Sequence, residues 1–146
     1  MPKIYIPVAI QIVVIELSKG YCEYRILPSN FSTDFFHFEH ILPITLNGKT
    51  DLENLARSCG ICNNNKSNSI QHIDPLTKHI VRLYHPRQDI WSEHFQWSDD
   101  DLHIVGITPI GRATINLLKL NRTNAVNLRK LLKMADLHPP INIIRD

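Results

Sequence analysis

The sequence predicts an α+β fold in which two strands and a short helix form the centre and further helices flank them. Residues 34–41 alternate aromatic and polar side chains, a period of two that is typical of a half-buried strand. Residues 54–58 can pair back as a second strand, and a helix begins near Gly60. Helical patterns at 7–18 and 109–136 lie on either side of this order of strand, loop, strand and helix.

The length and composition indicate one soluble domain, residues 1–146. A chain of 146 residues with 43% hydrophobic residues can bury a substantial core. Its three cysteines are an odd number, which argues against a disulfide scaffold and favours a reducing, cytoplasmic location. The apolar run Ile4–Leu17 is too short to span a membrane, and no small-residue cleavage site follows it. We therefore expect no membrane association.

The N-terminal segment 7–18 has two readings. Its β-branched residues favour a strand, whereas Pro7 at a first helical position and Gly20 just past the end favour a helix. We favour the helix. Because its polar positions are few, we expect it to be largely buried.

The first central strand ends at Pro43, and the loop 44–53 is centred on the turn dipeptide Asn47-Gly48. Beyond the central helix, Thr108 and Pro109 have the types expected at an N-cap and a first helical position. The remaining elements that we expect are a strand at 79–84, a hairpin over the Asp-rich tip within 91–108, and helices at 109–120 and 123–136, so that the C-terminal hairpin and helices occupy about 91–136.

The formal net charge is only +2, but the basic residues are unevenly placed. From Leu102 to Ala135 there is no acidic residue. This pattern predicts either a local basic surface that grips nucleic acid or ordinary solvated helix faces. The basic residues of the segment are Arg112, Lys119, Arg122, Arg129, Lys130 and Lys133.

The densest group of chemically active residues lies between His37 and Asn68. His40 can act as a general base near neutral pH, although a lone histidine is often structural. A carboxylate at Glu39 and an amide oxygen at Asn63 suit a hard divalent ion such as Mg²⁺. Strand alternation places Glu39 and His40 on opposite faces, so both can serve one centre only if the strand ends or twists there.

Two further polar residues have possible supporting roles. Asn54 can bridge the loop to a strand through its donor and acceptor atoms, which would hold the loop and orient His40. Lys66 lies three residues after Asn63 on the same helical face, and it could contact a phosphate as a point charge or be an ordinary exposed lysine.

The cysteines form an incomplete metal-binding pattern. Cys59 and Cys62 make a C-x-x-C, and Cys22 begins a second one in which Arg25 stands at the fourth ligand position. A closed zinc site needs four ligands, and a guanidinium group cannot ligate. We therefore expect the three thiols to pack together as small apolar groups rather than to bind structural zinc.

The motifs of residues 20–69 together resemble the HNH endonucleases, in particular the branch with two C-x-x-C knuckles around a ββα-metal finger. The resemblance rests on Glu39-His40, on Asp51-Leu52-Glu53-Asn54-Leu55 and on Cys59-x-x-Cys62-Asn63-x-x-Lys66. It implies a ββα-metal core and DNA cleavage with a divalent ion. It also implies that His40 is the general base, that Glu39, Asn63 and His37 lie at the metal, and that Asn54 braces the loop.

These observations lead to one hypothesis and two rivals. The hypothesis is an HNH-type DNA endonuclease that uses Mg²⁺ or Mn²⁺, with RNA as an alternative substrate. One rival is a catalytically inactive nucleic-acid-binding module on the same scaffold. The other, a purely structural zinc-ribbon protein, is disfavoured by the missing fourth ligand.

Overall fold

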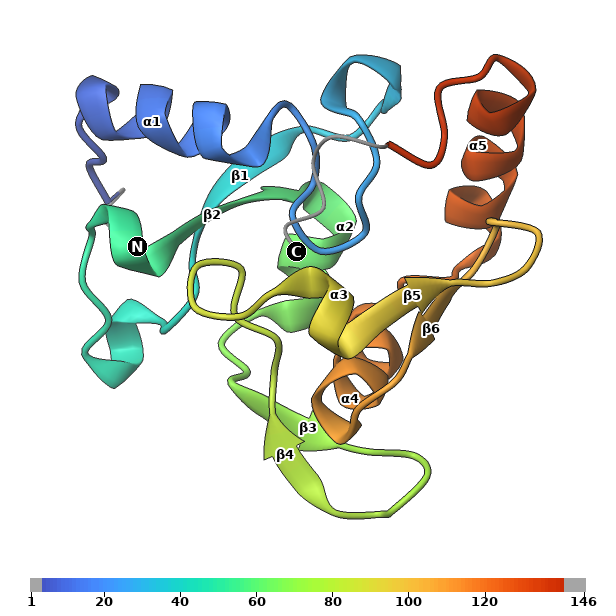
Figure 1. Cartoon of the computed structure of the whole chain (residues 1–146). Coiled ribbons are helices and arrows are strands. Elements are labelled where there is room, and N and C mark those ends of the chain that lie inside the picture. The colour runs from blue at the N-terminus through green and yellow to red at the C-terminus, as the bar shows by residue number, and fades with distance from the viewer. Residues whose placement is uncertain (1–3, 141–146) are drawn as a thin grey trace.

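The computed structural model of the chain, which describes residues 4–140, is built from helices and three two-stranded antiparallel sheets (Figure 1). This confirms the predicted α+β fold. No helix among the described residues is long and apolar enough to cross a membrane.

The centre is a ββα unit. β1 (Phe36–His40) pairs with β2 (Leu55–Cys59), and α2 (Gly60–Lys66) follows β2 directly. The register sets His40 opposite Leu55 at the end of β1. The Cys59 sulfur accepts a hydrogen bond from the Cys62 backbone N–H at 3.4 Å, and this bond caps α2. The predicted strand, loop, strand and helix are thus confirmed, and the two strands and the helix each start within two residues of the expected position.

α1 (Val8–Ser18) packs across β2 and the short 3₁₀ helix η3 (Leu52–Asn54). The predicted helix is confirmed, but the expectation that it is largely buried is wrong. Val14 and Ser18 are buried, whereas Val8 and Ile12 face outward. The two-stranded sheet covers only one side of the helix, so an apolar sequence alone could not bury the other side.

In the C-terminal half, two hairpins pack against the helix α4. Thr108 accepts a hydrogen bond from the Gly111 N–H at 3.1 Å, which confirms the predicted N-cap. The strand Gln71–Ile73 was not expected, because three residues show no usable periodicity. The elements of this half are β3 (Gln71–Ile73), β4 (Ile80–Arg82), α3 (Trp91–His94), β5 (Phe95–Trp97), β6 (Ile104–Gly106), α4 (Pro109–Leu118) and α5 (Thr123–Met134).

The main core joins the two halves through the cysteines. Cys22, Cys59 and Cys62 are fully buried and belong to one apolar cluster with aromatic side chains of the C-terminal half. The aromatic members are Tyr24, Tyr84, Trp91 and Phe95. The ββα unit is therefore supported from behind by the elements that follow it in sequence.

Four of the six basic residues between Leu102 and Ala135 are engaged within the protein, which disfavours the basic surface that was one of the two predicted alternatives. Arg129 is fully buried and donates to the backbone carbonyls of Leu102, Arg25 and Leu120. Arg112 pairs with Asp74 and Lys133 with Asp101, while the Arg122 guanidinium points to the cysteine sulfurs. Acidic and carbonyl groups from distant segments thus satisfy cations that the local sequence left unpaired.

Candidate active site

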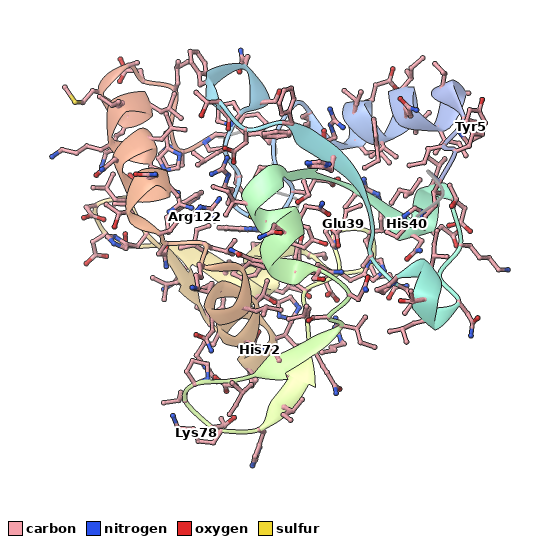
Figure 2. All side chains as sticks on the ribbon, turned by 180° about the vertical axis from the view of Figure 1, so that it is seen from behind. Tyr5, Glu39, His40, His72, Lys78 and Arg122 are labelled. Atoms are coloured by element: carbon pink, nitrogen blue, oxygen red, sulfur yellow. The ribbon has the colours of Figure 1, made fainter. Side chains whose placement is uncertain are left out.

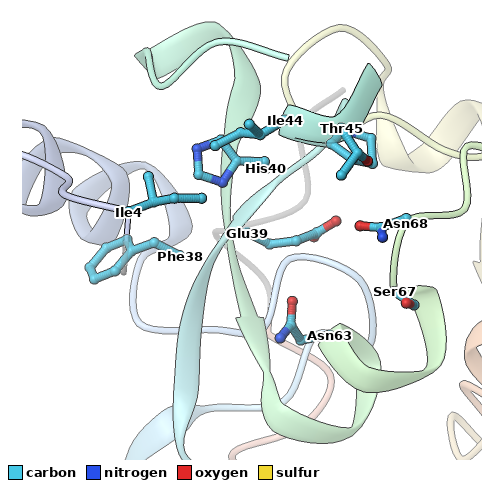
Figure 3. A pocket seen from close by; sticks show the side chains of 10 residues that line it. Ile4, Phe38, Glu39, His40, Ile44, Thr45, Asn63, Ser67 and Asn68 are labelled. Carbon is cyan, nitrogen blue, oxygen red and sulfur yellow. The ribbon is translucent and has the colours of Figure 1, made fainter. Parts of the chain in front are cut away.

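A pocket of about 450 Å³ lies where β1 ends, beside the start of the following loop and α2 (Figure 3). Glu39, His40 and Asn63 all line it. The rest of the lining is apolar on one side and small and polar on the other: Ile4, Phe38, Pro43, Ile44, Thr45, Ser67 and Asn68. The structure thus brings together three of the residues that the sequence singled out.

Glu39 and His40 reach this pocket from opposite sides of β1. Figure 3 shows the His40 ring on the side of Ile4, and the Glu39 carboxylate on the side of Asn63 and Asn68. β1 pairs only with β2, so its other edge has no strand beside it in the described part of the chain. The pocket can therefore extend around this edge, and no twist of the strand is needed to place both side chains at it.

Asn54 ties the ends of the loop between β1 and β2 together. Its Oδ1 accepts from the Leu42 N–H at 2.7 Å, and its Nδ2 donates to the carbonyls of Leu42 at 2.9 Å and Lys49 at 2.8 Å. A Cβ at Gly48 would overlap the Leu42 carbonyl, so the loop closes tightly only with glycine there. One amide side chain thus fixes the backbone that begins two residues after His40.

The same loop holds the His40 ring through Thr50. His40 Nε2 lies 2.8 Å from Thr50 Oγ1, and burial lowers the pKa of His40 below its ordinary value. If Nε2 carries the proton and donates to Thr50, Nδ1 is left as an acceptor. This arrangement keeps His40 neutral at pH 7 and leaves one nitrogen able to accept a proton.

Glu39 is buried against Lys66. The Lys66 Nζ lies 2.7 Å from Glu39 Oε1 and donates to the Ile41 carbonyl at 2.9 Å. Glu39 is 5% exposed and Lys66 only 1%. Burial raises the pKa of Glu39, while Lys66 and the Tyr24 hydroxyl oppose that rise. Lys66 therefore does not contact phosphate as predicted, because its ammonium is enclosed as the counter-ion of Glu39.

The residues around Glu39 fit a divalent cation. Both Glu39 oxygens are buried, and Oε1 is already engaged by the Lys66 ammonium. Figure 3 shows the Asn63 amide pointing toward this carboxylate. One carboxylate and one amide oxygen beside open pocket volume suit Mg²⁺ or Mn²⁺, which retain several waters. His37 is exposed on β1 and does not line the pocket, so it is not placed with Glu39 and Asn63 there.

The three cysteine sulfurs lie within 4.8 Å of one another behind the ββα unit. Hydrogen bonds from the thiols of Cys22 and Cys62 lower the pKa of Cys59, whereas burial raises the pKa of Cys22. The sulfurs are close enough to share one soft ion. The described residues offer no fourth cysteine, histidine or carboxylate to this group.

Arg25, at the fourth ligand position in sequence, and Arg122, from the start of α5, differ in how they relate to the cysteine cluster. The Arg25 guanidinium turns to Ser32 at 3.1 Å and Asp34 at 3.4 Å. The Arg122 guanidinium lies 3.6 Å from the Cys59 sulfur and 3.9 Å from the Cys62 sulfur (labelled in Figure 2). The cluster is thus more than apolar packing, because a cation from the N-terminus of α5 contacts two of its sulfurs.

The comparison with protein families agrees with this geometry. Residues 20–69 match the family model described as HNH endonuclease. Over this segment the chain is similar to HNH endonuclease domains. The match covers the cysteine loop, β1, β2 and α2, and it confirms the resemblance seen in the sequence motifs. Comparison with curated proteins and with solved structures gave no match.

The HNH match indicates nuclease-type chemistry with a divalent metal, and nucleic acid as its target. The structure adds residues in and around the pocket that the motifs did not reveal. Thr50 holds His40, and Ile4, Phe38 and Ile44 form the apolar side of the pocket. No local sequence pattern could have identified them, because they come close to His40 only in the folded chain.

We predict that Lys66→Met lowers the free energy of unfolding at pH 7 by about 3 kcal/mol, because it leaves a buried carboxylate without its counter-ion. Urea denaturation measures this change. The loss should shrink at pH 5, because the folded variant holds Glu39 at a raised pKa and takes up a proton more readily than the unfolded chain.

The double variant Glu39→Gln with Lys66→Met separates this pairing from a packing defect. It should recover more than half of the lost stability, since no unpaired charge remains buried. A Lys66→Met protein within about 0.5 kcal/mol of wild type would contradict the buried pair.

We predict substoichiometric zinc in the protein purified from zinc-supplemented cells, measured by elemental analysis, because the thiol cluster lacks a fourth ligand and already contacts Arg122. Arg25→Cys, which restores the fourth ligand position, should raise the content to about one zinc per chain. Arg25→Lys, which offers no thiolate, should not. One zinc per wild-type chain would refute the prediction.

Proposed function

We propose that the protein is a divalent-metal-dependent DNA endonuclease of the HNH type, which hydrolyses phosphodiester bonds with a water activated by His40. The observation that carries the proposal is that Glu39, His40 and Asn63, all within the segment that matches the HNH family model, line one pocket. RNA is a second possible substrate, and the assay below includes it.

The opposite directions of Glu39 and His40 suit an in-line displacement. In such a reaction the attacking oxygen and the leaving oxygen lie on opposite sides of the phosphorus. A phosphate at the free edge of β1 would have His40 on one side and the Glu39–Asn63 pair on the other. The alternation of a strand, which separates neighbouring residues, is therefore an advantage for this chemistry.

His40 would take a proton from the attacking water at Nδ1, with Nε2 held by Thr50. Thr50 and Asn54 are positioning residues, because the loop that they hold sets the direction of the ring. Glu39 and Asn63 would hold Mg²⁺ or Mn²⁺, which when bound polarises the phosphate and stabilises the leaving oxygen. Lys66 keeps Glu39 fixed, and it neutralises part of the charge that attracts the ion.

Supercoiled plasmid DNA is the direct test. We predict nicking in Mg²⁺ or Mn²⁺ that EDTA abolishes, with a loss of at least about 100-fold in His40→Ala, since general-base catalysis contributes about 10²–10⁴-fold. Asn63→Ala should lose activity by weakening metal binding, whereas Asn64→Ala, its exposed neighbour on α2, serves as the matched control and should not.

Parallel reactions with single-stranded DNA and RNA define the substrate class. Metal-dependent cleavage that persists in His40→Ala would reject the role of His40. Binding of nucleic acid without any metal-dependent cleavage would instead identify an inactive binding module on the same scaffold.

The pH profile gives a separate prediction. His40 must be neutral to accept a proton, and burial lowers its pKa from 6.5. We therefore expect kcat/KM to rise with pH along an acid limb whose midpoint lies below 6.5, and to be flat between about pH 7 and 8. A midpoint at 7 or above would contradict this environment for His40.

A further inference from the structure

The outer face of α1 is an unusual apolar surface. Val8, Ile12 and Ile15 recur at helical spacing and are 63%, 52% and 42% exposed. Tyr5, just before the helix, is 77% exposed. We call these four residues the α1 outer face. Figure 1 shows α1 at the periphery, lying across the β1–β2 sheet and away from α4 and α5.

A solvent-facing helix surface is normally polar. Here the one charged side chain of α1 is Glu16, which has no salt-bridge partner among the described residues. Contiguous exposed apolar surface of this kind is typical of an interaction site. The remaining question is which partner the face itself favours.

The face is complementary to itself. If two copies of α1 cross antiparallel with Ile12 on a two-fold axis, Val8 and Glu16 lie at equal distances of about 6 Å along the helix on either side. Glu16 of each copy then approaches the first turn of the other α1. That turn has no acidic residue and no side-chain cap, so its free N–H groups and positive helix dipole would attract a carboxylate.

The size of the face also fits a pair of copies. From the exposed fractions, the α1 outer face and the adjoining Ile4 offer roughly 500 Å² per copy, so a dimer would bury on the order of 1,000 Å². This is near the lower limit of specific interfaces, for which dissociation constants in the micromolar range are ordinary.

We propose that the α1 outer face is a homodimer interface, in which two copies of this chain pack α1 against α1 antiparallel about a two-fold axis near Ile12. Ile4 also lines the candidate active site, so each pocket would lie at the border of the interface. The proposal rests on exposure and charge alone and does not depend on nuclease activity.

Sedimentation of the full chain over about 1–200 μM tests the proposal. We expect a reversible dimer with a dissociation constant on the order of 10 μM. Ile12→Glu should raise that constant at least about tenfold, because two carboxylates would meet at the axis. Leu131→Glu is the matched control, since Leu131 is an apolar helix residue on α5 that is 63% exposed, against 52% for Ile12, and this variant should dimerise like wild type.

Glu16→Lys tests the orientation of the helices. It should weaken the dimer severalfold, more strongly at low salt, because a lysine would face the positive end of the other helix. A wild-type protein that stays monomeric at 200 μM, or an Ile12→Glu protein that dimerises unchanged, would overturn the interface. A Glu16→Lys dimer of unchanged strength would overturn the antiparallel arrangement. Circular dichroism of each variant identifies loss of folding, which none of these exposed sites should cause.

Discussion

The packing of the last helix on the ββα unit depends on buried contacts between arginine guanidinium groups and the cysteine segment. Arg122 at the start of α5 lies against the sulfurs of Cys59 and Cys62. Arg129, about two turns further along the same helix, donates to the Arg25 carbonyl in the cysteine loop. These contacts join the last helix to the ββα unit. A zinc ion in a knuckle scaffold ties chain segments together by direct bonds. Here hydrogen bonds from arginine make a comparable connection, and one acceptor is the Cys59 sulfur, whose pKa is lowered by hydrogen bonds from the thiols of Cys22 and Cys62.

The candidate active site shows the same reliance on internal cations. Glu39 is buried at the end of β1, where an unpaired carboxylate would be costly, and Lys66 neutralises it from α2. This pair sets the spacing between strand and helix, and so it also sets where Asn63 stands. A divalent ion held by Glu39 would meet a partly neutralised carboxylate, so phosphate oxygens of a substrate would be an important part of its ligand set.

The pocket, the loop and α1 are connected along one side of the molecule. Asn54 and Thr50 hold the loop that positions His40, while Ile4, just before α1, forms part of the pocket wall. The position of α1 therefore bears on the shape of the site. A second copy docked on α1 as proposed would place two pockets in one assembly.

The sequence by itself determined the order of elements in the ββα unit and the N-cap at Thr108, because these follow from local periodicity and capping chemistry. It also singled out Glu39, His40 and Asn63, which the fold brings to one pocket. The sequence did not determine which charged side chains are exposed and which are paired inside the protein. Lys66, Arg122 and Arg129 read as exposed basic residues, yet each is engaged by atoms that lie 25 to 104 positions away in the chain. Only tertiary packing decides such pairings, since a cation takes whichever acceptors the fold brings to it. The burial of α1 was wrongly predicted for a similar reason. Its sequence shows that most of its side chains are apolar, but only the packing of neighbouring elements decides which of its faces are covered.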